Sequence, residues 1–267
     1  MDHHDFGGLH EDLRLTGQSL KRRDVLRLAL GASVFSFLGC AEKLVAGDDG
    51  DVESSTGTAG CEVIPEETAG PFPGDGSNGP DVLNLSGVVR SDIRSSFAGL
   101  TGTAVGVPLR VTLRLVSLQA GCTAAAGLAV YLWHCDRAGR YSLYSAGATD
   151  QNYLRGVQES DANGELAFST IVPGCYAGRW PHIHFEVYPS LGEASSVGNK
   201  IATSQLALPE AACAAVYATT GYEASVGNLQ RVSLNTDNVF RDGANHQTAS
   251  MSGSVTAGLQ AVLTVAV

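Results

Sequence analysis

Two histidines separated by one residue carry the strongest chemical signal in this chain of 267 residues. His182 and His184 lie in a segment, 182–188, that alternates in strand fashion, so both side chains point to the same face. Two imidazoles roughly 7 Å apart along a strand can bind one metal ion. Tyr176 precedes the pair and Tyr141 lies further upstream. A phenolate is a hard anionic ligand that favours a ferric ion, so the sequence predicts a metal site here.

Three short motifs surround these residues in a fixed order. The first is Gly-Arg-Tyr-Ser at 139–142, the second runs over 161–176 and ends in Pro-Gly-Cys-Tyr, and the third is 179–185. This order resembles the intradiol ring-cleavage dioxygenases, over roughly residues 62–267. It is most similar to the secreted branch of that family, since only five residues separate Tyr176 from His182, and it also resembles the catalytic domain of the protocatechuate and catechol dioxygenases.

The resemblance implies an oxidoreductase that uses O2 to cleave a catechol-type ring, a small aromatic diol, to a cis,cis-muconate-type product. It implies a mononuclear non-haem Fe(III) cofactor held by four side chains: Tyr141, Tyr176, His182 and His184. Within that set, the resemblance gives Tyr176 a catalytic role as well: it is the ligand that leaves the iron when the catechol binds, and it takes up one of the catechol protons. The resemblance also implies catalytic roles for Arg179, near the substrate ring, and for Gln205, which stands where the family has a glutamine.

Several alternatives stay open at this point. A histidine pair on a strand also occurs in proteins without a metal, and a non-catalytic β-sandwich binding module could keep the same scaffold. Such a module needs no combination of two tyrosines with two histidines. Copper on the two histidines is a second alternative, although two phenolates favour ferric iron. Tyr144 is a rival to Tyr141 as a ligand, because it follows three residues later, whereas His134 is interpreted as structural.

The elements that must position these residues are short strands separated by turns. Alternation and β-rich runs predict strands over 108–118, 128–135, 165–171, 182–188, 201–208 and 254–266. A turn signal at 161–164 predicts a hairpin leading into the strand over 165–171, and the segment from Pro209 to about Tyr217 predicts a helix. These elements favour an all-β domain over 61–267, a two-sheet β-sandwich with long loops and at most one short helix.

The first 60 residues predict export. Residues 1–39 are interpreted as a signal peptide, because Arg22 and Arg23 precede an apolar run that is too short to span a bilayer. The paired arginines favour the twin-arginine route. Residues 37–40 resemble a bacterial lipobox, which predicts a lipid anchor at Cys40 as the only membrane attachment. Residues 40–60 are rich in Gly, Ser, Thr and acidic residues and predict a linker, so the domain is expected in the periplasm or on the cell surface.

Charge and cysteine content narrow the class further. The formal net charge of −10 argues against nucleic acid as a partner. The six cysteines stand at 40, 61, 122, 135, 175 and 213, and an exported chain permits disulfides. Their pairing does not follow from the sequence. Cys175 is either half of a disulfide that pins the Tyr176 loop or a small buried thiol. The oligomeric state and the identity of the catechol are left open.

Overall fold

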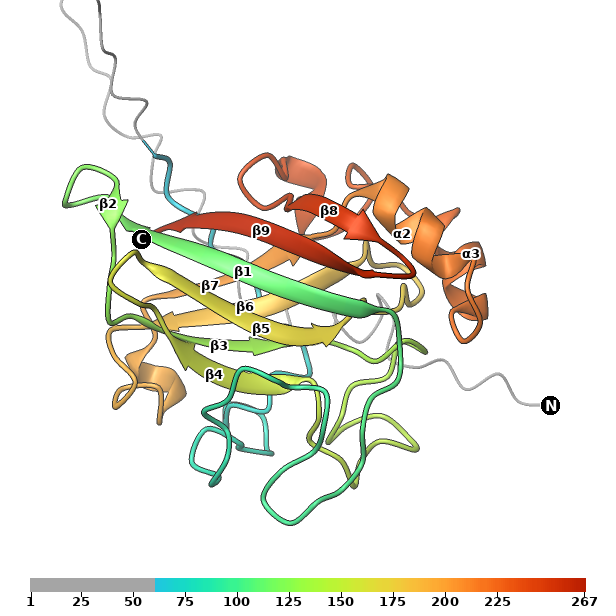
Figure 1. Ribbon diagram of the computed structural model, residues 1–267, viewed down its shortest axis with the longest axis horizontal. Coiled ribbons are helices and arrows are strands. Elements are labelled where there is room, and N and C mark those ends of the chain that lie inside the picture. The colour runs from blue at the N-terminus through green and yellow to red at the C-terminus, as the bar shows by residue number, and fades with distance from the viewer. Residues whose placement is uncertain (1–60) are drawn as a thin grey trace, which may run out of the picture.

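The computed structural model describes residues 61–267, which form two β-sheets packed face to face (Figure 1). The larger sheet has the strand order β2-β1-β9-β8, and β5 also pairs with β1. Its strands are β1 (Pro108–Ser117), β2 (Thr123–Ala124), β5 (Glu165–Ile171), β8 (Ser250–Ser254) and β9 (Gly258–Ala266). The smaller sheet has the order β4-β3-β6-β7. Its strands are β3 (Ala129–Trp133), β4 (Arg155–Glu159), β6 (His182–Tyr188) and β7 (Ala202–Ala207). The prediction of an all-β two-sheet sandwich is confirmed.

The core between the sheets is built from alternate residues of each strand. On β1, the inward side chains are exposed by 2% or less: Leu109, Val111, Leu113 and Leu115. On β6, the inward side chains are fully buried: Ile183, Phe185 and Val187. Each such side chain stabilises the fold by about 1.5–3 kcal/mol through burial. The last strand, β9, packs parallel to β1, so the C-terminal segment completes the larger sheet.

The other face of β6 is buried as well, which is what creates an interior site. His182, His184, Glu186 and Tyr188 point away from the core between the sheets, yet each is exposed by 3% or less. They pack with Tyr131 and Trp133 of β3 and with long loops that cover this side of the smaller sheet. The outer face of the smaller sheet is therefore a second packed layer, in which polar side chains lie out of contact with solvent.

The helical content exceeds the expected single helix. The predicted helix is present as α2 (Glu210–Tyr217), and a second short helix follows it, α3 (Glu223–Leu229). Sequence reasoning missed α3 because it contains Gly227 and buries only Ser225, so it has no apolar stripe. Two short 3-10 turns, Val197–Asn199 and Phe240–Asp242, complete the helical elements among residues 61–267.

The hairpin expected at 161–164 is wrong in its pairing, although the turn itself forms. Gly164 N donates to Asp161 O (2.9 Å), closing the turn. The preceding strand, β4, was not predicted, because it carries the buried Arg155 and lacks alternation. It pairs with β3 in the smaller sheet, whereas β5 pairs with β1 in the larger one. The turn therefore carries the chain from one sheet to the other.

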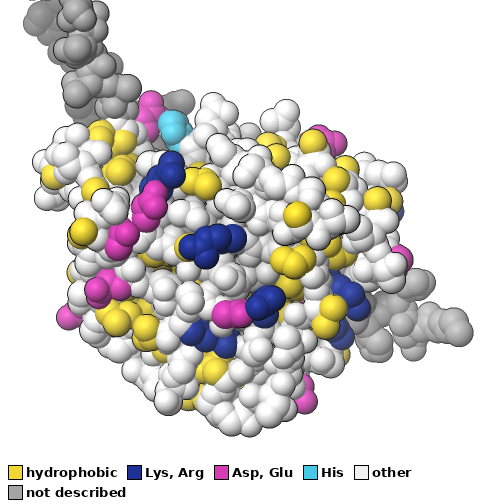
Figure 2. Space-filling model, in the orientation of Figure 1, with side chains coloured by type: hydrophobic (Ala, Val, Ile, Leu, Met, Phe, Trp, Pro, Cys, Tyr) yellow, Lys and Arg dark blue, Asp and Glu magenta, His cyan; other side chains and the backbone are white. Residues whose placement is uncertain are grey.

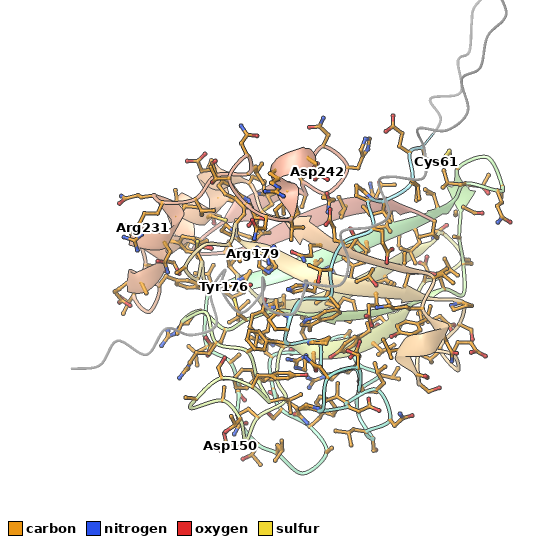
Figure 3. All side chains as sticks on the ribbon, turned by 180° about the vertical axis from the view of Figure 1, so that it is seen from behind. Cys61, Asp150, Tyr176, Arg179, Arg231 and Asp242 are labelled. Atoms are coloured by element: carbon orange, nitrogen blue, oxygen red, sulfur yellow. A yellow bond between two sulfur atoms is a disulfide. The ribbon has the colours of Figure 1, made fainter. Side chains whose placement is uncertain are left out.

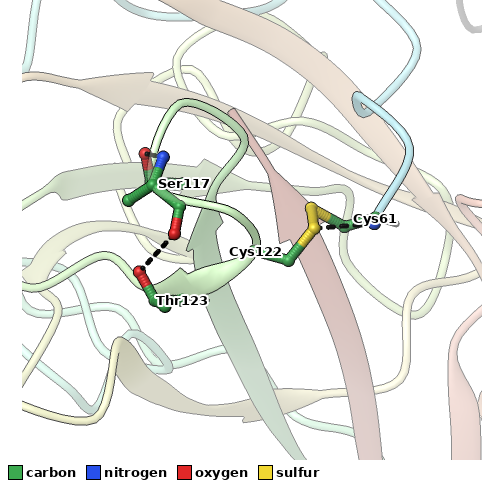
Figure 4. Close-up of a disulfide and its surroundings, with 5 residues drawn as sticks. Cys61, Ser117, Cys122 and Thr123 are labelled. Atoms are coloured by element: carbon green, nitrogen blue, oxygen red, sulfur yellow. Dashed lines mark hydrogen bonds between the residues drawn. A yellow bond between two sulfur atoms is a disulfide. The ribbon is translucent and has the colours of Figure 1, made fainter. Parts of the chain in front are cut away.

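One disulfide joins the start of the described chain to the end of β1. Cys61 bonds to Cys122 beside the β1–β2 turn, where Ser117 and Thr123 lie (Figure 4). The remaining described cysteines are buried free thiols: Cys135, Cys175 and Cys213. The disulfide considered for Cys175 is therefore not formed. The predicted signal peptide (1–39), the anchor at Cys40 and the linker (40–60) lie outside the described residues.

The exposed face of the larger sheet is polar. Basic and acidic side chains are scattered over the face shown in Figure 2, and one pair, Arg114 and Glu165, joins neighbouring strands at 2.7 Å. None of the helices formed by residues 61–267 has the length and apolar character needed to cross a membrane.

Candidate metal centre

Four predicted ligand side chains converge on one point beneath the loops that cover the smaller sheet. His182 and His184 come from β6, Tyr141 from the loop after β3, and Tyr176 from the loop between β5 and β6. The hydroxyl of Tyr141 lies 3.3 Å from His182 Nε2 and 3.2 Å from His184 Nε2. The Tyr176 hydroxyl lies 3.2 Å from His182 Nε2, and the two Nε2 atoms are 3.1 Å apart. We call these four residues the donor cluster.

Glycines allow the two tyrosine loops to approach one another. Gly139 has φ of 81°, and a Cβ there would lie 3.0 Å from the Cβ of Tyr176. Gly174 packs equally closely, because an added Cβ would lie 2.6 Å from the carbonyl oxygen of Arg137. Side chains at these positions would push apart the loops that carry Tyr141 and Tyr176. The Gly-Arg-Tyr and Pro-Gly-Cys-Tyr motifs therefore supply the close contact as well as the tyrosines.

The two histidines are oriented by different neighbours. His182 Nδ1 lies 2.5 Å from the carbonyl oxygen of Trp180, which can only accept, so Nδ1 carries the proton and the Nε2 lone pair faces the cluster. The ring of His184 instead stacks on Trp133, with centroids 4.9 Å apart and planes at 6°. Its Nδ1 is buried and has no hydrogen-bond partner. The orientation of His184 thus depends on ring packing, whereas that of His182 depends on a hydrogen bond.

Burial sets the charge state of the donor cluster. It lowers the pKa of His182 to about 3, helped by the positive charge of Arg179. Burial and the neighbouring His182 lower the pKa of His184 well below its ordinary value. Burial, with Tyr176 beside it, raises the pKa of Tyr141 well above its ordinary value. The imidazoles are therefore neutral and able to ligate a metal, while the Tyr141 phenol ionises only if a cation is bound next to it.

The donor cluster fits a ferric ion by donor chemistry and by spacing. Nitrogen and oxygen ligands of a first-row ion at about 2.0–2.2 Å lie roughly 3 Å apart when they are adjacent, close to the separations observed here. Elsewhere within residues 61–267, no three His, Cys, Asp or Glu side chains gather as a metal site. A set of two neutral imidazoles and two potential phenolates favours the hard, highly charged Fe(III) over softer metal ions.

Arg179 lies beside the donor cluster in a polar network that we call the arginine cluster (Arg179, Gln205 and Asp237). Arg179 N donates to the carbonyl oxygen of Tyr176 (3.4 Å) in the loop that precedes β6, and Figure 3 shows the two residues close together. The Arg179 guanidinium donates from Nε to Asp237 Oδ2 (2.9 Å) and from Nη2 to Gln205 Oε1 (2.7 Å). Gln205 pairs with His184 across β6 and β7. Two of the three predicted catalytic residues, Arg179 and Gln205, therefore adjoin the donor cluster, and the third, Tyr176, belongs to it.

Tyr144, the rival ligand, does not reach the donor cluster. Its hydroxyl accepts from Gly74 N (2.9 Å) and donates to Asn78 Oδ1 (2.8 Å). The ring of Phe72 lies between the two tyrosines, with centroids 5.0 Å from Tyr141 and 5.3 Å from Tyr144. The structure therefore brings Tyr141 and not Tyr144 to the histidines.

His134 is buried away from the donor atoms and holds the two sheets together. Its Nε2 lies 2.7 Å from Thr170 Oγ1 on β5, and its Nδ1 lies 2.8 Å from Cys135 O. The structural interpretation of His134 matches this placement.

Sequence reasoning missed three residues of the site: Trp133, Arg155 and Asp237. Arg155 is 1% exposed and ties the loop at Phe72 to the loop of Tyr141. Its donors reach Phe72 O, Pro73 O, Tyr131 Oη, Ser142 O and Ser142 Oγ. An isolated arginine in a segment without alternation is a weak signal, but a basic residue buried on a strand needs such partners.

Comparisons with known proteins find similarity to one enzyme family. A sequence profile of the dioxygenase family matches residues 79–196, which include the donor cluster and Arg179. A solved intradiol ring-cleavage dioxygenase from Tetranychus urticae aligns with a TM-score of 0.61 and 25% identity, covering 77% of this chain and 94% of that one. No curated protein matches the sequence.

Two further solved structures align with this chain at lower similarity. Catechol 1,2-dioxygenase from Pseudomonas arvilla has a TM-score of 0.45 and 17% identity, over 76% of this chain and 61% of that one. Hydroxyquinol 1,2-dioxygenase from Pseudomonas putida has a TM-score of 0.44 and 18% identity, over 80% of this chain and 68% of that one.

Proposed function

This chain resembles the intradiol ring-cleavage dioxygenases, and we propose that it is an Fe(III)-dependent enzyme that cleaves a catechol-type ring with O2 to a cis,cis-muconate-type product. The observation that carries the proposal is the convergence of two tyrosine hydroxyls and two imidazole nitrogens, which are linked by four contacts of 3.1–3.3 Å. No other property of a β-sandwich requires those four side chains to meet in a buried position.

The four donor residues would hold the ferric ion, with Tyr141 and the two histidines as its lasting ligands. Bound there, Fe(III) would supply a Lewis acid that binds both catechol oxygens and a redox centre that makes the ring reactive toward O2. The surrounding layer of aromatic side chains excludes water, which strengthens every electrostatic interaction at the site.

Tyr176 has the position suited to a ligand that is displaced and takes up a proton. It belongs to a loop rather than a strand, and at 8% it is the most exposed member of the donor cluster. A catechol must lose two protons to bind through both oxygens. The Tyr176 phenolate would accept one of them, and a hydroxide ion would accept the other. Its rotation toward the loop side would open the place that the substrate fills.

Arg179 would stabilise negative charge that develops on the substrate ring. Its guanidinium is 1% exposed and is held by Asp237 and Gln205, so its position is fixed before the substrate arrives. A preorganised charge in a buried site acts strongly on a developing carbanion because no solvent has to reorganise around it.

An oxygen-uptake experiment tests this function directly. Purified, iron-loaded protein should consume O2 with at least one of catechol, protocatechuate and hydroxyquinol, and the product mass should equal the substrate plus both oxygen atoms of labelled O2. Incorporation of a single labelled atom, or cleavage beside the two hydroxyl-bearing carbons, would contradict intradiol chemistry. A protein that binds these compounds without consuming O2 would instead be a binding module.

We also propose that the protein is exported and anchored by lipid at Cys40. The Cys61–Cys122 disulfide supports export, because such bonds persist in oxidising compartments. Replacing Arg22 and Arg23 together with lysine should hold the precursor in the cytoplasm, and Cys40→Ser should release the mature protein from membranes. Normal export of the first variant would rule out the twin-arginine route, and an unchanged membrane fraction of the second would rule out the anchor.

A further inference from the structure

Asp237 is a fully buried carboxylate beside the proposed active site, and both of its oxygens accept hydrogen bonds. Its Oδ2 accepts from Arg179 Nε (2.9 Å) and from the backbone N–H of Trp180 (2.7 Å). Its Oδ1 accepts from the backbone N–H groups of Val239 (2.8 Å) and Phe240 (3.2 Å). The side chain is fully buried, so these bonds are shielded from solvent. One carboxylate therefore joins Arg179 to a loop that lies 58 residues further along the chain.

The loop that carries Asp237 is itself held in place. Asp237 N donates to Ser233 O (2.9 Å), and the side chains of Val239 and Phe240 pack with Trp180 in a small apolar cluster. Trp180 is fastened at its other end, because its Nε1 donates to Leu208 O (2.9 Å). The position of the Asp237 carboxylate is thus fixed by its surroundings, and its hydrogen bond fixes the position of the Arg179 guanidinium in turn.

Charge favours the pairing of Asp237 with Arg179. Burial alone would raise the pKa of Asp237, but the charge of Arg179 and the hydrogen bonds from Trp180 and Arg179 hold it below its ordinary value. The carboxylate stays ionised, and a buried ion pair of this kind is strongly perturbed when one partner is removed.

We propose that Asp237 is a positioning residue, which orients Arg179 toward the substrate ring and acts on turnover only through Arg179. The inference builds on the proposed ring-cleavage function and extends it beyond residues 79–196, the part of the chain that matches the family profile. The hydrogen bonds of the Asp237 carboxylate go to Arg179, Trp180, Val239 and Phe240, and none of these four belongs to the donor cluster. Its role is to hold the guanidinium at one angle, and a misplacement of about 1 Å at such a group can cost about 100-fold in rate.

The test is a double-mutant cycle on the iron-loaded protein. Asp237→Asn keeps the shape of the side chain and loses the charge, and we expect it to lower kcat by about 10- to 100-fold with a much smaller change in KM. In an Arg179→Leu background the same substitution should change kcat by less than about twofold, because the group it acts through is gone. The visible absorption of the bound iron should be the same in Asp237→Asn as in the wild type.

Asp136→Asn is the matched control. Asp136 is 4% exposed, accepts two backbone N–H groups with Oδ1 and pairs with Arg140 through Oδ2 at 2.8 Å, but it does not contact Arg179. Any effect of Asp136→Asn on kcat should therefore persist in the Arg179→Leu background. If the effect of Asp237→Asn persists there as well, Asp237 is merely structural and the proposal fails.

A second readout needs no catalysis and no iron. In the metal-free protein, the Nε–H proton of Arg179, assigned by its loss in Arg179→Leu, should exchange slowly with water in nuclear magnetic resonance spectra. Asp237→Asn should speed that exchange by about tenfold or more, whereas Asp136→Asn should leave it unchanged. Unchanged exchange in Asp237→Asn would overturn the positioning role. A wild type that cleaves no catechol would sink the proposed function, while this measurement would still report on the pair.

Discussion

The donor cluster and the arginine cluster lie side by side, but the arginine cluster contains two charged side chains, whereas burial keeps side chains of the donor cluster neutral. In the arginine cluster, the guanidinium of Arg179 meets the carboxylate of Asp237 at 2.9 Å, with both side chains buried. In the donor cluster, burial keeps the imidazoles of His182 and His184 neutral and opposes ionisation of Tyr141. In the arginine cluster the two charges balance each other within the chain. The donor cluster becomes anionic only when a cation is bound beside its tyrosines.

This difference predicts two kinds of failure. Substitutions in the donor cluster should change how much iron the protein binds. Those in the arginine cluster should leave the iron in place and slow the reaction. The four predictions below test that division, beginning with the largest expected effect.

Removing either histidine should have the greatest consequence. His182→Ala or His184→Ala should lower iron affinity by more than the roughly 10- to 100-fold that loss of an outer partner costs, and should abolish turnover. Iron content after dialysis measures this. His134→Gln is the control, because His134 is equally buried but lies outside the donor cluster. If His134→Gln lost as much iron as the histidine ligand variants, general unfolding would account for all three.

The two tyrosines should differ from one another. In the proposed site Tyr141 would be the phenolate that stays on the iron, and Tyr176 the ligand that the substrate displaces. Tyr141→Phe should therefore weaken ferric binding more than Tyr176→Phe. We expect Tyr176→Phe to retain iron while losing activity and part of the visible absorption. Tyr144→Phe should change little, since its hydroxyl bonds to Gly74 and Asn78 instead. Loss of colour in Tyr144→Phe, with colour kept in Tyr141→Phe, would reverse the ligand assignment.

Arg179→Leu should slow the reaction without loss of iron. Removal of one preorganised electrostatic partner typically lowers kcat by about 100- to 1000-fold. Steady-state kinetics with iron content measured on the same sample checks this. Arg114→Leu is the control, because Arg114 forms an exposed pair with Glu165 on the larger sheet. Wild-type turnover in Arg179→Leu would show that the two clusters do not act on one substrate.

Acid should act on the buried histidines and on the arginine cluster in different pH windows. Burial lowers the pKa of His134 to about 4 and that of His182 to about 3. The unfolded chain binds these protons at about pH 6.5, so the metal-free protein should lose stability as the pH falls below that value. Asp237, whose pKa is lowered, should contribute a loss only below its ordinary pKa of 3.8.

Urea unfolding near pH 7 and near pH 5 measures this loss. His134→Gln should remove about 2 kcal/mol of the decrease seen at about pH 5. Equal decreases in wild type and His134→Gln would contradict the account of the buried histidines.

The parts of the site that sequence predicts are those fixed by local periodicity. Alternation along β6 placed His182 and His184 on one face and Phe185 on the other, as the structure shows. The same periodicity predicted most of the strands and hence the sandwich. The hydroxyl-to-imidazole contacts depend on tertiary folding, although each tyrosine lies two residues after a glycine that permits a close approach of the two loops.

The missed residues depend on register and on packing between distant segments. Trp133 lies against His184 because β3 and β6 pair in that register, which no local pattern specifies. Asp237 lies in a polar loop without periodicity and reaches Arg179 only after the whole chain has folded. Choosing Tyr141 over Tyr144 likewise required the position of the Phe72 ring between them.

The central claim is that the donor cluster binds one ferric ion, and the iron content and visible spectrum of the purified protein test it most directly. Phenolate ligands transfer charge to Fe(III) and absorb visible light, so the account predicts a reddish protein with about one iron per chain. Arg179→Leu should keep that colour, and His184→Ala should lose it. A wild-type protein that stays colourless and iron-free after reconstitution with ferric or ferrous salts would contradict the account.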